Sequence, residues 1–339
     1  MKLEHLHFLI CPACDSSLKL NEVSEQEEDH VVTGQLCCES CATEYPVVRS
    51  VPRFVPRENY ASGFGLQWTE HAKTQYDSYT GTSISEDRFF NETGWSRDLA
   101  GEVILEVGSG SGRFTEQALT TGAMVISLDY SYAVDANNQL NGGHDNLLLV
   151  QGDVRALPFR RQGFDKVFCF GMIQHTPDPE GSFRALPPCV KPGGELVVDV
   201  YYKNRLGRLF SFTPAPPTKY WVRPFTTRIE PARLYKLIER YIDTFWPLAN
   251  LLRRIPRIGR NLNWMLLIAD HSDRGLPEKI VREWACLNTF DMLAPKYDLP
   301  QTLSEVYCWF QEADLAEVIV ERGYNGIVGR GKPPPLDSA

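Results

Sequence analysis

Two acidic residues and three glycines are spaced in a way that suits a nucleotide-type ligand. Glu106 precedes Gly108, Gly110 and Gly112, and Asp129 follows further along the chain. Glycines let the backbone approach a ligand closely, and free N–H groups at a helix N-terminus attract its anionic part. An acid about 20 residues after such glycines is placed to hold ribose hydroxyls. This group of residues therefore predicts a ribose-bearing ligand.

The flanking residues predict the elements that position these groups. Residues 103–107 are a short apolar run, which is typical of a parallel strand buried on both faces. Phe114, Ala118 and Leu119 then recur at helical spacing, so a helix follows the glycine turn. Residues 123–129 form a second apolar run that ends in the acid. The order strand, glycine turn, helix, strand is that of an α/β fold.

The glycine pattern separates two kinds of nucleotide-binding fold. A dinucleotide fingerprint needs a glycine at position 113, where this chain has Arg113. The observed order, Glu-x-Gly-x-Gly-x-Gly, resembles motif I of the class I S-adenosylmethionine (SAM) methyltransferases instead. A flexible loop in an unrelated α/β protein is the alternative. Further motifs of that family follow in order, at residues 150–159, 164–171, 191–194 and 195–200, so that the resemblance covers roughly residues 95–203 and, less tightly, 301–332.

This resemblance implies a Rossmann-like α/β sheet that is mostly parallel with one antiparallel strand. It also implies SAM as the cofactor. Asp129 would hold the ribose hydroxyls, and Asp153 would face the adenine amino group. The full set of cofactor-binding residues expected from the resemblance is Glu106, Gly108, Ser109, Gly110, Gly112, Asp129, Tyr130, Asp153, Val154, Phe170 and Gly171.

A pair of CxxC motifs near the N-terminus predicts a structural zinc site. Cys11 and Cys14 form the first motif, and Cys38 and Cys41 form the second. Two such knuckles supply the tetrahedral set of four thiolates that Zn²⁺ prefers, and a closed set of four leaves no catalytic position. A redox dithiol is the alternative, but two motifs in so short a segment favour metal. We favour Cys38 over its neighbour Cys37 because it keeps the two-residue gap.

The segment that carries these cysteines, residues 1–55, resembles the small zinc-ribbon module fused to, or partnering with, several methyltransferases. Tyr45-Pro46-Val47-Val48 and Val51-Pro52-Arg53-Phe54 after the second knuckle carry this part of the resemblance. A module of this size buries little core, so the metal would supply much of its folding free energy.

Two residues are candidates for catalysis. His175 follows the fourth strand, and ligands of doubly wound sheets lie at the carboxyl ends of strands. Its intrinsic pKa suits a general base, whereas the alternative is a structural histidine. Asp291 lies among apolar residues and is a second candidate for contacting the acceptor. Its alternative role is that of a helix-capping acid.

An aromatic-rich segment precedes the first strand of the sheet. In similar methyltransferases this segment folds over the SAM site as a lid, which would bring Gln67, Trp68 and Tyr76 to cofactor or substrate. The alternative is that these aromatic side chains only pack the segment onto the core.

The order of these features predicts the domain organisation. Helical patterns at Arg233–Phe245 and Ile280–Phe290 indicate a helical insertion after the fifth strand, and Pro214, Pro216 and Pro217 form a break within it. Its position over the carboxyl edge of the sheet favours a role in substrate binding. The predicted parts are a zinc ribbon (1–55), a lid (56–94), the SAM-binding core (95–203), the insertion (204–303), a C-terminal helix and two strands (304–332) and a tail (333–339).

Composition and charge limit the class of protein. Hydrophobic residues make up 43% of the chain, which is ample for a soluble core. The sequence contains no run of 18 apolar residues, so we expect no membrane-spanning helix. Nine cysteines, an odd number, and a start without a signal-peptide pattern favour a reduced, cytoplasmic setting. Residues 203–260 hold thirteen Lys or Arg and three acids, which is a net charge of +10. Because the whole chain has a net charge of −8, the other residues together carry −18.

The acidic remainder disfavours nucleic acid as a general partner. The basic stretch 203–260 has three interpretations: a solvated face, a site for a phosphorylated acceptor, or a peripheral contact with an anionic membrane beside a lipid-linked acceptor, through Leu206–Phe212 and Leu248–Ile258. The leading hypothesis is a SAM-dependent methyltransferase for a small or lipid-linked metabolite. The alternatives are an rRNA or tRNA base methyltransferase and a non-catalytic scaffold with the same fold. The sequence does not determine the oligomeric state.

Overall fold

A computed structural model describes residues 1–56, 59–203 and 218–335. These residues fall into two compact units. The first comprises Met1–Asn59, Ser83–Lys203 and Tyr297–Ala339, and the second comprises Tyr60–Thr82 and Asn204–Lys296. The predicted lid segment, residues 56–94, is thus divided between the units. The predicted proline break and the stretch Leu206–Phe212 lie outside the described residues.

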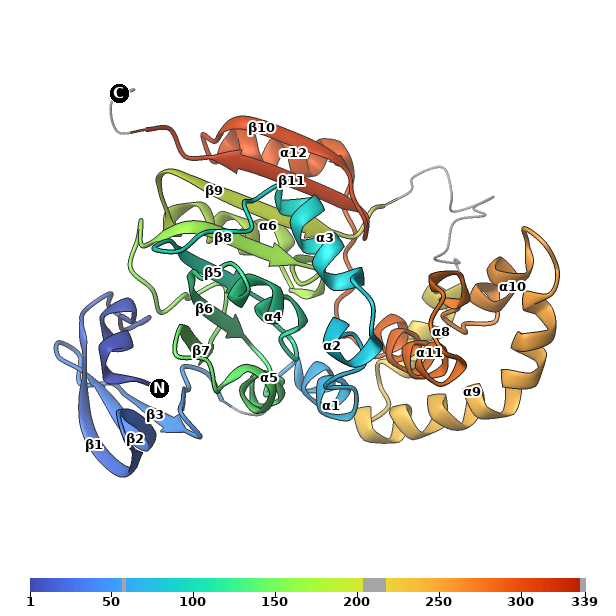
Figure 1. The fold of residues 1–339 in the computed structure, drawn as a ribbon, viewed down its shortest axis with the longest axis horizontal. Coiled ribbons are helices and arrows are strands. Elements are labelled where there is room, and N and C mark those ends of the chain that lie inside the picture. The colour runs from blue at the N-terminus through green and yellow to red at the C-terminus, as the bar shows by residue number, and fades with distance from the viewer. Residues whose placement is uncertain (57–58, 204–217, 336–339) are drawn as a thin grey trace. The chain divides into compact units, whose positions relative to one another are not determined.

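The first unit is built on a seven-stranded sheet with the order β10-β11-β9-β8-β5-β6-β7 (Figure 1). Strand β11 runs antiparallel to both its neighbours, β9 and β10, and the other four strand pairs of the sheet are parallel. The prediction of a mostly parallel sheet with one antiparallel strand is confirmed. The strands are β5 (Val103–Val107), β6 (Met124–Asp129), β7 (Leu147–Gln151), β8 (Phe164–Phe170), β9 (Val190–Val200), β10 (Ala316–Arg322) and β11 (Ile327–Lys332).

Both faces of this sheet are covered, because alternate residues of each central strand enter two different cores. In β5, Leu105 packs into one cluster and Ile104 into the other, and in β6 the same holds for Ile126 and Val125. This alternation explains why the strands read as continuous apolar runs. The helices of this unit are α3 (Ile84–Thr93), α4 (Arg113–Leu119), α5 (Val134–Asn141), α6 (Pro179–Arg184) and α12 (Leu303–Glu312), with the 3₁₀ turns η2 (Ile173–His175) and η3 (Pro187–Cys189).

The N-terminal ribbon belongs to the same unit and shares its core. It is a four-stranded antiparallel sheet in the order β1-β2-β3-β4. Leu9 forms an isolated β-bridge with Phe159, which lies between β7 and β8 in the sequence. The side chains of Leu9 and Leu36 lie in one apolar cluster with Leu105 of β5. The ribbon is therefore part of a continuous apolar core. Its elements are η1 (Leu3–Phe8), β1 (Leu18–Glu27), β2 (His30–Cys38), β3 (Glu44–Val48) and β4 (Val51–Pro52).

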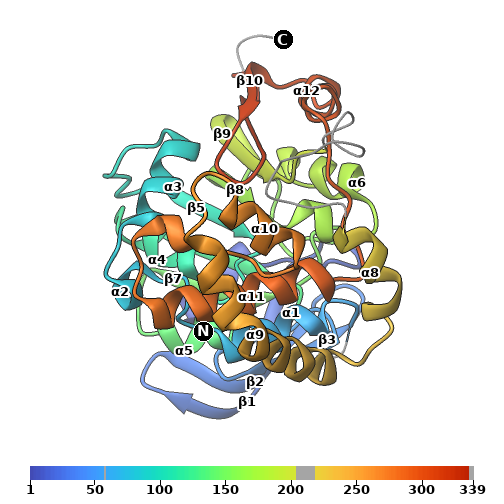
Figure 2. The ribbon, with the colours of Figure 1, turned by 90° about the vertical axis from the view of Figure 1, so that its right-hand side faces the viewer.

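The second unit is helical. It contains α1 (Ser62–Glu70), α2 (Asp77–Thr80), α8 (Thr218–Thr226), α9 (Pro231–Arg253), α10 (Gly259–Met265), η4 (Ser272–Arg274) and α11 (Glu278–Leu293). Helix α9 is longer at both ends than the predicted 233–245 and continues through Pro247. It buries one stripe, including Ile238, Ile242 and Trp246, and packs with α10 and α11 (Figure 2). That stripe has the spacing of an amphipathic helix.

No helix among the described residues is both long enough and apolar enough to span a membrane.

Candidate functional site

The glycine turn after β5 adopts backbone conformations that other residues rarely take. Gly108, Gly110 and Gly112 have φ angles of +89°, +56° and +96°. A Cβ atom on Gly108 would lie 2.5 Å from the Cβ of Met172, and one on Gly112 would lie 2.2 Å from Oδ1 of Asn137. The turn therefore needs glycine for its conformation at all three positions and for its packing at two of them.

Asp129, the last residue of β6, is tied to this turn. Its Oδ2 accepts a hydrogen bond of 2.8 Å from the backbone N–H of Gly110. Its Oδ1 accepts hydrogen bonds from the N–H and the hydroxyl of Ser131, at 2.8 and 2.7 Å. Burial raises the pKa of this carboxyl above its ordinary value. The carboxylate is therefore held in a fixed orientation beside the glycines.

A buried side chain in the turn lacks a partner of its own. The Oγ of Ser109 is buried and has no hydrogen-bond partner among the described residues. Buried polar atoms are nearly always hydrogen-bonded, so an orphan at a ligand-binding turn suits a bound polar group. Together with the glycine cradle and the oriented carboxylate of Asp129, it fits the ribose and amino-acid parts of SAM.

Glu106 has a different environment from the one a ligand contact needs. Its Oε2 accepts hydrogen bonds from the hydroxyls of Thr115 and Ser127, the latter at 2.8 Å. The amide of Asn137 donates to the same two hydroxyl oxygens, at 2.9 and 3.3 Å. Burial raises the pKa of Glu106 to about 7. This carboxyl thus joins β5, α4, β6 and α5 beneath the turn.

The remaining predicted cofactor residues lie at the carboxyl ends of neighbouring strands. Asp153 follows β7, and both its oxygens contact the guanidinium of Arg155, at 3.1 and 2.7 Å. Gly171 follows β8 with a φ of +68°. Tyr130, Val154 and Phe170 are the residues adjacent to Asp129, Asp153 and Gly171. Because these strands are parallel, their ends share one edge of the sheet with the glycine turn.

The four predicted zinc ligands lie together in the ribbon. The Sγ atoms of Cys11, Cys14, Cys38 and Cys41 are all within 4.8 Å of one another. The Cys11–Cys41 pair is 3.7 Å apart and the Cys14–Cys38 pair is 3.4 Å apart. A tetrahedral site with Zn–S bonds of about 2.3 Å separates its sulfurs by about 3.8 Å. The thiols therefore fit a structural zinc ion.

Cys37, the competing residue, points elsewhere. Its Sγ donates to the carbonyl of Cys38 at 3.6 Å and does not belong to the four-thiol cluster. The backbone N–H groups of Ser40 and Cys41 instead donate to Sγ of Cys38, both at 3.4 Å. Such N–H···S contacts stabilise the charge of a metal-bound thiolate. The geometry therefore selects Cys38 as the ligand.

Two family models match the chain. The model described as a methyltransferase domain matches residues 105–198, and the model described as a Trm112p-like protein matches residues 2–50. The chain contains a class I methyltransferase domain behind a Trm112p-like module. The sheet order, the glycine turn and the cysteine cluster agree with these two matches.

The similar curated proteins match only part of this chain. The ubiquinone biosynthesis O-methyltransferase of Acinetobacter baumannii is 32% identical over 121 residues, which are 34% of this chain and 51% of that protein. Its namesake in Pseudomonas fluorescens is 31% identical over 121 residues, or 35% and 52% of the two chains. The chain thus spans about half the length of these curated relatives. A solved O-methyltransferase family protein of Burkholderia thailandensis is 11% identical with a TM-score of 0.44, over 77% of this chain and 60% of that one.

His175 is buried in η2, directly after β8 of the methyltransferase domain. Its Nδ1 lies 3.0 Å from the carbonyl oxygen of Tyr297, and its ring meets that of Tyr201 edge to face, with centroids 5.3 Å apart. A carbonyl only accepts, so Nδ1 carries the proton and Nε2 has the lone pair when the ring is neutral. The contact thus fixes the tautomer that a general base at Nε2 requires.

The other predicted acceptor residues belong to the second unit. Asp291 lies in the last turn of α11, so the alternative role of an N-terminal helix cap is wrong. Gln67 and Trp68 lie on α1, and Tyr76 precedes α2. Gln67 and Tyr76 are buried, whereas Trp68 is half-buried. These residues and His175 thus fall in different units of the chain.

Sequence reasoning missed a buried ion-pair cluster in the methyltransferase domain. The guanidinium of Arg88 in α3 donates to Oδ2 of Asp199 in β9 at 2.9 Å and to Oε2 of Glu92 at 3.1 Å. It lies over the rings of Phe114 and Tyr324, at 5.1 and 5.3 Å from their centroids. Burial raises the pKa of Glu92 to about 7. The available signal was an acid inside the otherwise apolar end of β9.

Arg253, which belongs to the basic stretch, has a structural role. Nε of Arg253 donates to Oδ2 of the fully buried Asp270 at 3.0 Å, and its guanidinium lies over the ring of Trp246 at 4.4 Å. The amide of Asn263 donates to the same oxygen of Asp270 at 2.6 Å. Arg253 therefore joins α9 to the segment before α11, and the net charge of residues 203–260 overstates the charge available to a partner.

Proposed function

We propose that this protein is a SAM-dependent methyltransferase that acts on a small molecule. The observation that carries the proposal is the carboxylate of Asp129, held by the N–H of Gly110 and by Ser131 beside a three-glycine turn. The unpartnered Oγ of Ser109 in the same turn supports it, because this oxygen offers a hydrogen bond to a ligand. The matched methyltransferase domain supports the same assignment.

SAM supplies an electrophilic methyl group when it is bound. The protein's own contribution is to orient the two reactants in line and to exclude water. In this proposal the glycine turn and Asp129 bind the cofactor, and Asp153 contacts the adenine of the cofactor. Nε2 of His175 accepts the proton of a hydroxyl or N–H acceptor while Nδ1 stays hydrogen-bonded to the carbonyl of Tyr297.

The relatives support a small-molecule acceptor. Two of the similar curated proteins are named as ubiquinone biosynthesis O-methyltransferases, and each matches this chain over 121 residues. Asp291 and Gln67, which this proposal assigns to the acceptor, lie in the second unit, whereas the proposed base His175 lies in the first. We therefore transfer the reaction class and leave the acceptor to be determined.

A lipid-linked acceptor is the second candidate. Trp221 and Phe225 lie four residues apart on α8 with exposed fractions of 72% and 67%, and Arg228, which follows the helix, is also exposed. Exposed aromatic residues beside a basic side chain suit the interface of an anionic membrane. This arrangement favours a peripheral contact of the second unit with lipid.

A methyl-transfer assay with labelled SAM distinguishes these proposals. The protein is incubated with a cell extract that is then separated into lipid, RNA, protein and small-molecule fractions. Label in the small-molecule fraction supports the first proposal, and label in the lipid fraction supports the second. Label in RNA alone would contradict both. No measurable binding of SAM at high micromolar concentration in calorimetry would instead favour the scaffold alternative.

A further inference from the structure

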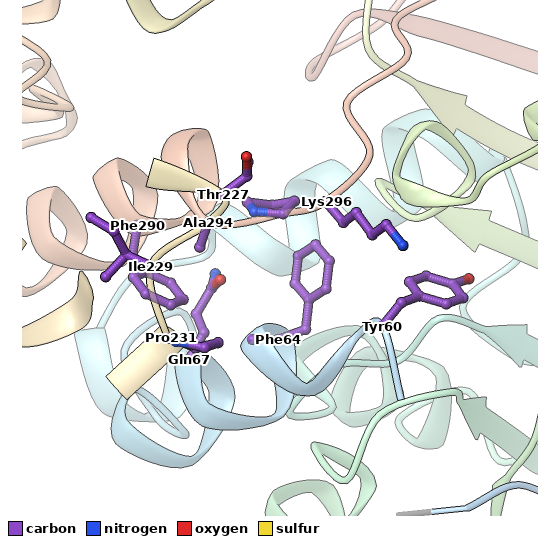
Figure 3. A pocket seen from close by; sticks show the side chains of 11 residues that line it. Tyr60, Phe64, Gln67, Thr227, Ile229, Pro231, Phe290, Ala294 and Lys296 are labelled. Carbon is purple, nitrogen blue, oxygen red and sulfur yellow. The ribbon is translucent and has the colours of Figure 1, made fainter. Parts of the chain in front are cut away.

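The second unit contains a pocket of about 330 Å³. Apolar and aromatic side chains form most of its wall, among them Phe64, Ile229, Phe290 and Pro295. In Figure 3 the amide of Gln67 and the ring of Phe64 point from α1 into this space, and Lys296 and Tyr60 line it as well. Ligand pockets of proteins start at about 300 Å³, which is room for a molecule of one or two rings.

One wall of the pocket is fixed by the end of α11. The buried guanidinium of Arg223 in α8 donates to the carbonyl oxygens of Met292 and Pro295, at 2.9 and 2.8 Å. The hydroxyl of Thr226 donates to the carbonyl of Leu293 at 2.8 Å. These bonds satisfy carbonyl groups that a helix end leaves without partners. They also hold the lining residues Ala294 and Pro295 in place.

A second wall is fixed by aromatic contacts. The fully buried ring of Phe290 meets the ring of Tyr235 edge to face, with centroids 5.7 Å apart. The hydroxyl of Tyr235 lies 3.0 Å from Nε2 of His71. Burial lowers the pKa of His71 to about 4, so its ring is neutral near pH 7. The apolar wall is therefore formed before any ligand arrives.

The side-chain amide of Gln67 differs from these groups, because its oxygen has no hydrogen-bond partner among the described residues. Gln67 is 1% exposed, so this oxygen, Oε1, is buried. A buried acceptor without a partner destabilises a fold, and its persistence at a pocket wall indicates a use. A ligand that donates a hydrogen bond to this oxygen would satisfy it.

Two residues of this pocket are direct neighbours in the sequence of residues that belong to the first unit. Tyr60 is the next residue after Asn59, whose Nδ2 donates to the carbonyl of Tyr130 at 3.0 Å. Lys296 directly precedes Tyr297, whose carbonyl contacts His175. Two lining residues are thus bonded to residues that contact Tyr130 and His175 in the first unit.

We infer that this pocket binds the methyl acceptor, and that the acceptor is a flat, largely apolar molecule that donates a hydrogen bond to Oε1 of Gln67. That the ligand is the methyl acceptor rests on the proposed function, whereas the chemical class of the ligand follows from the pocket alone. Phenols are the simplest compounds with these properties, and their methyl ethers lack the donor.

The test uses fluorine NMR on the full-length protein with two probes, 4-fluorophenol and 4-fluoroanisole. The phenol should bind saturably and at least roughly tenfold more tightly than the anisole, because only the phenol donates to Gln67. Gln67→Met should remove this preference while the melting temperature stays equal or rises, since an unpaired buried oxygen is lost. Ala294→Phe should fill the pocket and abolish binding of both probes.

Controls separate the pocket from the fold and from the cofactor site. Gln311→Met, on an exposed position of α12, should keep the phenol preference, and circular dichroism checks that the Ala294→Phe protein is folded. The inference is overturned if the wild type shows no saturable phenol binding, if the Gln67→Met protein keeps the preference, or if folded Ala294→Phe binds the phenol unchanged. Calorimetry with SAM is run in parallel: a protein that binds the phenol but not SAM contradicts the proposed function and leaves the pocket assignment standing.

Discussion

Asp129 and Gly110 are joined by a hydrogen bond of 2.8 Å between a side-chain oxygen and a backbone N–H. This bond links the end of β6 to the glycine turn that follows β5. The carboxylate is thus oriented by the fold before a ligand binds, and the conformation of the turn depends on the same side chain. Replacing Asp129 should therefore affect the ligand and the turn together.

Asp129→Ala should raise the dissociation constant for SAM at least about tenfold, because a charge-assisted hydrogen bond is worth about 1.5–3 kcal/mol. Isothermal titration measures it. Ser131→Ala removes one of the bonds that orient the carboxylate and should have a smaller effect. An unchanged dissociation constant in folded Asp129→Ala protein would remove this residue from the site.

The ribbon should hold one zinc ion per chain. Cys38→Ser should lose the metal, whereas Cys37→Ser should keep it, because only Cys38 lies in the four-thiol cluster. Elemental analysis of protein purified without chelator measures the content. The Cys38→Ser protein should also melt several degrees lower, since Cys11 and Cys38 lie in the core shared with the large sheet. Less than half an equivalent in the wild type would count against the site.

Glu106→Gln should change how stability depends on pH. Burial raises the pKa of this carboxyl from 4.5 to about 7, so the folded state binds its proton more tightly than the unfolded state does. Glu106 therefore costs no stability below pH 4.5, and its cost grows as the pH rises to about 7. Above that pH the cost is constant, on the order of 3 kcal/mol.

The measurement is the free energy of unfolding of both proteins from pH 4 to pH 8 without SAM. The stability of Glu106→Gln relative to the wild type should rise between pH 4.5 and 7 and be level above. The exposed Glu312→Gln serves as the control for loss of a carboxyl group. A difference that does not vary with pH would show that ionisation of Glu106 is not penalised.

Arg88→Met should destabilise the first unit by about 3–5 kcal/mol at pH 8, because it leaves the carboxylates of Asp199 and Glu92 buried without their cation. The loss should be smaller at pH 5.5, where Glu92, with its pKa raised to about 7, is protonated. Chemical denaturation at both pH values measures this. Arg88→Lys keeps the positive charge, so its free energy of unfolding should lie between those of the wild type and Arg88→Met. An equal loss at both pH values would indicate that packing, not charge, dominates.

His175→Asn separates a base from a structural histidine. The Asn amide can replace the Nδ1–H that faces the carbonyl of Tyr297, but it offers no lone pair at the position of Nε2. If Nε2 is the base, kcat should fall about 100-fold or more, with the SAM dissociation constant unchanged. Once an acceptor is known, steady-state kinetics measure it. Full activity of His175→Asn would assign the histidine a structural role.

The sequence by itself determined the features whose parts are neighbours along the chain. The glycine turn, the acid that ends β6 and the two CxxC motifs are local, because each depends on backbone conformation or on side chains a few residues apart. The strands of the sheet were also readable, since burial on both faces leaves continuous apolar runs. These features were enough to predict the sheet, the cofactor and the metal.

Only the tertiary structure decided which distant residues meet and which polar groups are buried. Arg88 and Asp199 are 111 positions apart, and nothing in either neighbourhood names the other as its partner. The second unit joins residues 60–82 to residues of the insertion, which turned Gln67 from a proposed lid residue into part of a pocket wall. Whether a polar side chain is solvated, paired or orphaned depends on the atoms that surround it in space, and most of these come from elsewhere in the chain.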